Sequence, residues 1–101
     1  MPANSNLKSK EMDMLCQALL QLETVEECYQ FFEDICTMAE MHALSQRLQV
    51  AKMLKDKVTY QEISRLTGAS TATISRVNRC VAYGSGGYGL VLERLEAQGE
   101  Q

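Results

Sequence analysis

The sequence lacks most of the residues that break helices or build catalytic and metal sites. Its 101 residues include one proline, one histidine and no tryptophan, and 46% of them are hydrophobic. The four cysteines form no C-x-x-C pair, and no carboxylate pair or nucleophile–base pair stands out. We therefore expect a compact, mostly helical protein with no cofactor, no metal and no catalytic residue.

Long apolar runs are also missing. The chain has no stretch of about 18 apolar residues, and its start has no basic segment followed by an apolar core. We expect neither a membrane span nor a secretory signal, and we expect the cysteines to be reduced and mostly buried in a cytoplasmic protein. The length fits one domain over residues 1–101, with a disordered start at residues 1–7.

Charge is distributed unevenly along the chain. Residues 1–41 hold two basic and eight acidic side chains, a net charge of −6, and residues 81–101 hold one and three, a net of −2. Residues 42–80 hold seven basic and two acidic side chains, a net of +5. The total of −3 alone disfavours a nucleic-acid partner, but the positive segment is the kind of charge that a phosphate backbone attracts. A solvated charged face is the alternative interpretation.

Apolar residues recur at three- and four-residue steps through most of the chain, as along one face of a helix. Capping boxes at Thr24 with Glu27 and at Thr37 with Glu40 mark two helix starts. The pattern predicts an all-α fold of about six helices, at residues 8–22, 25–36, 38–56, 60–67, 71–81 and 89–97. A Gly-rich linker at 83–89 lacks the lysine and Ser/Thr of a phosphate-binding loop, so we interpret it as a turn.

Residues 59–80 have the pattern of a helix-turn-helix, two short helices joined by a tight turn. Thr59 with Glu62 forms a capping box for the first helix. Gly68 suits the sharp reversal, and Ser70 can cap the second helix. Four apolar residues would pack the two helices together: Ile63, Leu66, Ile74 and Val77. Ser64 and Thr67 depart from the pattern, which often has Ala and Leu at those places.

The polar face of the second helix carries side chains that reach bases and phosphates. We expect Thr71 and Thr73 to touch base edges, and Arg79 to meet phosphates together with lysines of the preceding helix. The candidate DNA-binding residues are Ser70, Thr71, Thr73, Arg76, Arg79, Lys52 and Lys55.

Three apolar residues fall outside the stripes of the first two helices: Met14, Leu20 and Tyr29. A helix that is apolar around most of its circumference is usually buried. These residues either complete a monomeric core or lie in the interface of an intimate homodimer. We favour the dimer, which would also place two DNA-reading helices in successive major grooves about 34 Å apart.

The segment from Thr37 to Arg76 resembles the Trp repressor. The shared features are T-x-x-E from Thr37, A-L-x-x-R at 43–47, Q-x-E-[IL] from Gln61, G-A at 68–69 and A-T-I-[ST]-R at 72–76. Over about residues 7–97 the chain is similar to the small YerC/YecD-type Trp repressor-related proteins of bacteria. The resemblance implies an intertwined all-α homodimer and a sequence-specific transcriptional regulator, expected to be a repressor, with a double-stranded DNA operator as partner.

The resemblance also implies a site for a small-molecule corepressor. In the Trp repressor the corepressor indole lies between two arginines, and the matching positions here are Arg47 and Arg76. A glycine follows the second arginine there, whereas this chain has Val77, whose branched side chain should crowd an indole at a cost of about 1–3 kcal/mol. The implied effector is therefore not tryptophan. Alternatively, Arg47 and Arg76 serve as phosphate contacts or form internal salt bridges, and Arg47 is then structural.

Two other classes of function stay open. A helical protein-interaction module without specific DNA binding would hold a protein partner at high salt, whereas DNA binding would weaken as salt rises. An enzyme is disfavoured because no catalytic constellation is evident. The operator sequence, the genes controlled and the sign of regulation do not follow from the residues.

Overall fold

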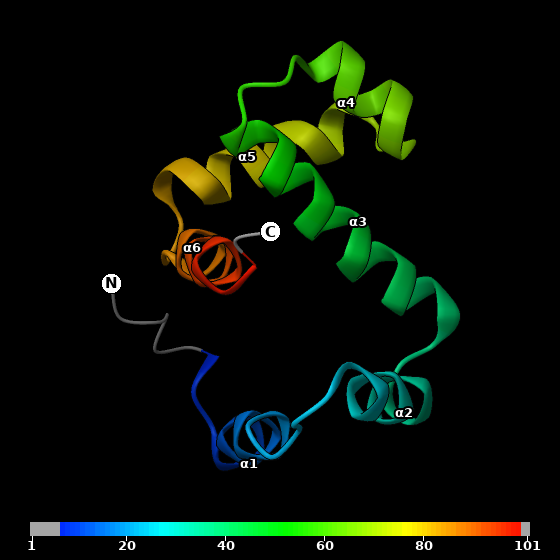
Figure 1. Ribbon diagram of the computed structural model, residues 1–101, viewed down its shortest axis with the longest axis vertical. Helices are drawn as coiled ribbons and strands as arrows, with labels where there is room; N and C mark the ends of the chain where they lie inside the picture. The colour runs from blue at the N-terminus through cyan, green and yellow to red at the C-terminus, as the bar shows by residue number, and fades with distance from the viewer. Residues whose placement is uncertain (1–6, 100–101) are drawn as a thin grey trace. The chain divides into compact units, whose positions relative to one another are not determined.

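A computed structural model describes residues 7–99 of the chain. Its helices are α1 (Lys10–Leu19), α2 (Val25–Ile35), α3 (Met38–Lys55), α4 (Tyr60–Thr67), α5 (Thr71–Tyr83) and α6 (Gly87–Gln98), and this part of the chain contains no strand (Figure 1). The prediction of an all-α fold with six helices is confirmed. The expected disordered start at residues 1–7 falls, except for Leu7, outside the described residues.

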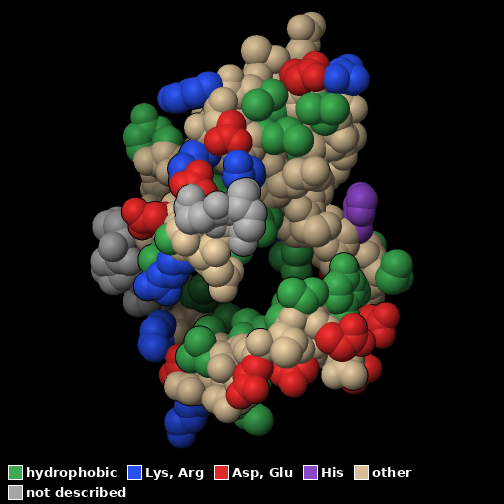
Figure 2. Space-filling view, in the orientation of Figure 1, with side chains coloured by type: hydrophobic (Ala, Val, Ile, Leu, Met, Phe, Trp, Pro, Cys, Tyr) green, Lys and Arg blue, Asp and Glu red, His purple; other side chains and the backbone are tan. Residues whose placement is uncertain are grey.

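The helices gather into two compact units, one ending at His42 and one beginning at Ala43, so α3 starts in the first and ends in the second. The first unit has no core of its own, because no residue of α1 or α2 is buried. Figure 2 shows apolar side chains lying open beside the acidic side chains of these helices. The most exposed apolar residues of this unit are Met14, Leu20, Val25, Tyr29 and Met38.

Side-chain caps define where the helices of the first unit begin. The backbone N–H of Glu27 donates to Thr24 Oγ1 at 3.0 Å, but the Glu27 carboxylate accepts from the N–H of Glu23 rather than from the cap residue. Thr37 and Glu40 form the complete reciprocal box, with bonds of 2.9 and 3.1 Å. The predicted start of α3 is therefore held by both arms of the capping box.

The second unit surrounds a small core to which all four of its helices contribute. Ile63 of α4, Ile74 and Val77 of α5 lie in it as predicted, and α5 packs on both α4 and α6. Leu66 was expected there as well, but it is 52% exposed. Position 66 lies about 60° from position 63 around the helix, and the small side chain of Ala69 in the turn is buried instead. The complete core cluster is Val50, Ala51, Ile63, Ala69, Ile74, Val77 and Leu92.

The expectation that the cysteines are mostly buried is wrong. Cys16 and Cys80 are exposed, and Cys28 and Cys36 are half-buried, although all four are free thiols. Cys28 belongs to the apolar face of α2, and no residue of that helix is buried within this chain.

The Gly-rich segment between α5 and α6 is shorter than the expected linker at 83–89. Helix α5 continues to Tyr83 and α6 begins at Gly87, so three residues connect them. A Cβ at Gly84 would collide with the carbonyl oxygen of Cys80, and Gly86 has a φ of 92°. Only glycine meets both requirements without strain, which fixes where α5 stops and α6 starts.

Helix α3 ends in a left-handed turn at Lys57. The N–H of Lys57 donates to Leu54 O, and the N–H of Val58 donates to Met53 O, both at 3.0 Å. Lys57 has a φ of 66°, a conformation that favours glycine. A lysine here therefore costs stability relative to glycine.

We expect Lys57→Gly to stabilise the protein by about 0.5–1 kcal/mol, because glycine takes a positive φ without the Cβ clash. Urea unfolding at one fixed protein concentration measures the change. Lys57→Ala removes the same charge but keeps the Cβ, so it serves as the matched control. Equal stability of the glycine and alanine variants would contradict the strain that we assign to this turn.

Candidate nucleic-acid interface

Helices α4 and α5 and the turn between them lie where the sequence predicts a helix-turn-helix. The N–H of Glu62 donates to Thr59 Oγ1 at 3.2 Å, so Thr59 caps α4. Gly68 ends α4 with a φ of 77°, and its N–H donates to Ser64 O at 2.9 Å. Ser70 caps α5 through a 3.1 Å bond from the N–H of Thr73. The turn is thus closed by the residues expected to close it.

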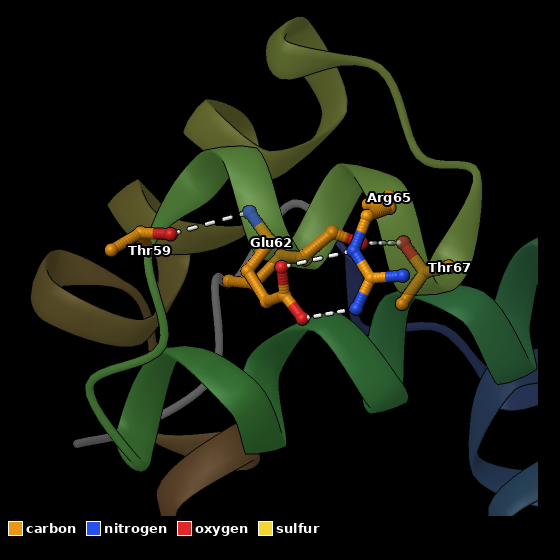
Figure 3. A network of polar contacts seen from close by, with 5 residues as sticks. Thr59, Glu62, Arg65 and Thr67 are labelled. Atoms are coloured by element: carbon orange, nitrogen blue, oxygen red, sulfur yellow. Dashed lines mark hydrogen bonds and ion pairs between the residues drawn. The ribbon is translucent and has the colours of Figure 1, made fainter.

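The second arm of the predicted capping box at α4 is absent. The Glu62 carboxylate does not return to the N–H of Thr59 but forms an ion pair with Arg65, one turn further along the helix (Figure 3). The hydrogen bond to Arg65 lowers the pKa of Glu62 and raises that of Arg65. A guanidinium within reach competes better for the carboxylate than a backbone N–H does.

Ser64 and Thr67, the two departures from the usual pattern, both form hydrogen bonds within the turn. Ser64 Oγ donates to Ala69 O at 2.8 Å. Thr67 Oγ1 donates to Ile63 O at 2.7 Å and accepts from the N–H of Ala69 at 3.1 Å. These hydroxyls therefore replace apolar contacts by hydrogen bonds that hold the chain on both sides of Gly68.

Gln46 of α3 is a residue of this site that the sequence analysis missed. Its Nε2 donates to the carbonyl of Thr67 at 3.1 Å, across 21 residues of chain. The carbonyls in the last turn of a helix lack partners within the helix, and this amide satisfies one of them. Gln46 thereby links α3 directly to the turn. No local sequence signal marks such a long-range bond.

The two lysines predicted to bind phosphates form ion pairs within the chain. Lys52 Nζ lies 2.7 Å from Asp56 Oδ2, and this hydrogen bond raises the pKa of Lys52. Lys55 Nζ lies 3.0 Å from Glu96 Oε1 and so connects α3 to α6. Both pairs are exposed, and such pairs are weak enough to exchange partners. The seven basic residues of this segment are therefore less available than the charge count indicates.

The polar residues of α5 differ in whether their side chains already have hydrogen-bond partners within the chain. Ser70 Oγ, besides capping the helix, lies 3.1 Å from Thr73 Oγ1, so these two hydroxyls are paired. Thr71 and Arg79 are exposed, and within residues 7–99 neither side chain has a hydrogen bond or an ion pair. Thr71 at the start of α5 and Arg79 near its end are the candidates most open to a ligand.

The charges of the candidate effector residues Arg47 and Arg76 both act on the hydroxyl of Tyr88. Burial raises the pKa of Tyr88, the Cys80 thiol acts in the same direction, and the charges of Arg47 and Arg76 oppose it. Both arginines are exposed. Val77 lies differently: it is 3% exposed and belongs to the core cluster. Val77 thus packs inward, whereas the two arginines lie at the surface.

An open, mostly apolar pocket of about 570 Å³ lies beside Tyr88. It is lined by α3, α5, α6 and the short connection between the last two helices. The lining residues are Leu48, Cys80, Gly84, Ser85, Gly87, Tyr88 and Val91. Among the described residues, no group of three His, Cys, Asp or Glu side chains comes together as a metal site. Nor does any described helix have the length and hydropathy needed to cross a bilayer.

Comparison with known proteins gives one consistent family. The sequence profile of the family described as "Trp repressor protein" matches residues 10–96. The chain is 51% identical over 90 residues to YerC of Bacillus subtilis strain 168, described as an uncharacterized protein, and the match covers 89% of this chain and 86% of YerC.

Two crystal structures share the fold. A TrpR-like protein from Eubacterium eligens is 54% identical, with a TM-score of 0.88 over 91% of this chain and 95% of its own. A putative Trp repressor from Staphylococcus aureus is 52% identical, with a TM-score of 0.86 over 89% of this chain and 90% of its own. At such identity, both the helix order and the turn between α4 and α5 are expected to be shared.

Proposed function

The chain belongs to the Trp repressor family, and on that premise we propose that it is a sequence-specific DNA-binding regulator of transcription, acting as a homodimer on a double-stranded operator. Repression by occupying that operator is the simplest mode of action, since we assign no catalytic residue. A DNA partner implies a cytoplasmic location.

The observation that carries this proposal is the turn between α4 and α5, which helix caps and hydrogen bonds hold in one conformation. Gly68 and the cap at Ser70 fix the start of α5, Ser64 bonds across the turn, and Gln46 of α3 bonds to it from outside. A helix fixed at its N-terminus presents its polar side chains at defined positions, as entry into a major groove requires. Such rigidity supports DNA reading over a plain helical hairpin.

We assign different roles to the polar residues of this region. Thr71 is open for a base edge, and Ser70 and Thr73 contribute mainly by capping α5 and through contacts of their methyl or methylene groups. Arg79 is the principal phosphate contact. Lys52 and Lys55 can join it after leaving their carboxylate partners.

We expect Arg79→Ala to weaken operator binding roughly tenfold. The slope of the logarithm of the dimer's binding constant against the logarithm of salt concentration should also fall by the contribution of about two phosphate contacts, one for each protomer. Genomic fragments selected on the wild-type protein, followed by mobility-shift titration at several salt concentrations, measure both. Arg94→Ala removes the same charge from α6 and should leave binding nearly unchanged.

The proposal fails if the wild-type protein retards no genomic fragment at low salt while the two arginine variants behave identically. Capture of a protein partner at high salt, without salt-sensitive DNA binding, would point to the interaction module instead. Testing both arginines on one fragment separates a specific contact from a general effect of net charge.

The dimer is supported by the first unit, whose helices α1 and α2 contain no buried residue. These helices are 10 and 11 residues long, and isolated helices shorter than about 12–15 residues are marginal in water. A second copy of the chain is the partner that the family favours for covering their apolar faces.

Any small-molecule effector is, in our proposal, not tryptophan. Val77 stands where the Trp repressor has the glycine that lets an indole approach the backbone, and its branched side chain is held in the core cluster. Arg47 and Arg76 remain the candidate effector residues.

A further inference from the structure

The hydrogen bond from Gln46 joins two parts of the second unit that lie 21 residues apart in the sequence. Gln46 lies in the middle of α3, one helical turn before Val50, which is fully buried in the core cluster. The Gln46 side chain is half-buried, and its Nε2 donates to Thr67 O at 3.1 Å. The amide thus reaches the last residue of α4 from a helix that the core already holds in place.

The turn around Gly68 has hydrogen bonds of two kinds. The N–H of Gly68 donates to Ser64 O at 2.9 Å, and Ser64 Oγ donates to Ala69 O at 2.8 Å. Both bonds lie within the turn and its helix, so they hold the shape of the turn but do not set where it lies in the protein. The bond to Thr67 O comes from α3 and does set this.

Packing in the core does not replace the bond from Gln46. Ala69 of the turn is 2% exposed and belongs to the core cluster. Apolar burial has no preferred direction, whereas an amide bonds to a carbonyl only over a narrow range of distance and angle. Ala69 therefore anchors the turn, and Gln46 fixes its orientation against α3.

Helix α3 carries the effect of this bond further. It starts in the first unit and ends in the second, and its 18 residues span about 27 Å. In the proposed dimer the first unit supplies the contact between copies, so α3 is the continuous element that leads from that contact to the reading helix. Two copies of α5 must meet successive major grooves about 34 Å apart. Rotation of the turn against α3 would change that separation.

We propose that Gln46 is a positioning residue: its bond to Thr67 O fixes the turn against α3 and so sets the separation at which the dimer's two copies of α5 read an operator. Gln46 touches no base in this role, but it decides how strictly the spacing between the two half-sites is enforced. This inference rests on the proposed function and assigns to it a source of operator selectivity.

Gln46→Met tests this role, because methionine has about the same length but no N–H donor. The probe is an operator selected on the wild type, compared with the same operator carrying one more base pair between its half-sites. The added base pair moves one half-site by about 3.4 Å and rotates it by about 35°. We expect it to weaken binding of the wild type about 100-fold and binding of Gln46→Met about tenfold, because the turn of each protomer rotates more easily without the bond.

Two further variants control for the chemistry and for stability. Gln46→Glu should discriminate as poorly as Gln46→Met, since an ionised carboxylate cannot donate to a carbonyl. Gln49→Met makes the same substitution at an exposed residue of the same helix, and it should keep the wild-type ratio of affinities. That ratio does not depend on the fraction of folded protein, so a purely stabilising role of Gln46 would leave it unchanged.

Amide hydrogen exchange measures the effect of the bond without DNA. The N–H of Ala69 donates to Thr67 Oγ1 at 3.1 Å, within the same turn. Its exchange, followed by NMR, should be about fivefold faster in Gln46→Met than in the wild type, and unchanged in Gln49→Met.

The outcomes separate the two hypotheses. If Gln46→Met discriminates between the two operators as strongly as the wild type, or if its Ala69 N–H exchanges at the wild-type rate, the positioning role is wrong and the regulator stands. Faster exchange in Gln46→Met, with no operator binding by the wild type, would overturn the regulator and the spacing role with it. The bond would then remain only a structural contact of the turn.

Discussion

Replacing Val25 and Tyr29 by glutamate is expected to convert the proposed dimer into monomers. The two residues lie one turn apart on α2, and they are 73% and 59% exposed in the single chain. If a second copy covers this face, each new carboxylate must lose its hydration there or force the copies apart. We expect the dissociation constant to rise at least about a hundredfold, roughly 3 kcal/mol.

Sedimentation analysis over a range of concentrations measures the change in association. Helix content by circular dichroism should fall in parallel, because α1 and α2 would lose the surface against which they fold. Operator affinity should drop as well, since a monomer offers one reading helix in place of two.

Gln30→Glu is the matched control for this pair. It adds the same side chain to α2 at an exposed residue next to Tyr29, but on the polar side of the helix. It should remain dimeric. If Gln30→Glu dissociates as readily as the double variant, or if the wild type is monomeric, the apolar face of α2 is not the interface.

Ile74→Ala should cause a large loss of folding stability in the second unit. The side chain is fully buried, and it joins α5 to the rest of the core cluster. Truncation removes apolar contacts and leaves a cavity, which costs about 2–5 kcal/mol. That is a large part of the total stability of about 5–15 kcal/mol typical of a protein, so the DNA-reading helix would lose its support.

Urea unfolding at constant protein concentration measures this loss, since the stability of a dimer depends on concentration. Ile74→Val removes one methylene and should cost only about 0.5–1.5 kcal/mol. Ser75→Ala, at the exposed neighbouring position, should change little. Equal stabilities for the alanine and valine variants would show that Ile74 is not packed as described.

The parts of the fold that the sequence predicted best are those that depend on neighbouring residues. Thr59, Gly68 and Ser70 mark the limits of α4 and α5, and each cap bonds to an N–H or carbonyl within four residues along the chain. Such contacts join residues a few positions apart, so the spacing of residue types in the sequence predicts them. The six helices therefore followed from the sequence.

Predictions that depend on distant residues succeeded less well. Leu66 has the right periodicity for the core, yet it is 52% exposed. Cys16 and Cys28 are not buried because no residue of α1 or α2 is buried within one chain. In the site, the bond from Gln46 to Thr67 leaves no trace in the local sequence pattern. These features arise only when separate helices meet.

The ion pairs of α3 have a further consequence. Lys52 and Lys55 already pair with the carboxylates of Asp56 and Glu96, so in the proposed complex an operator phosphate would have to displace an internal counterion. Added salt weakens the protein's own pairs as well as its contacts with DNA, and the two effects oppose one another. Competition between carboxylate and phosphate for the same ammonium groups would give this regulator a shallower response to ionic strength than its seven basic residues at 42–80 indicate.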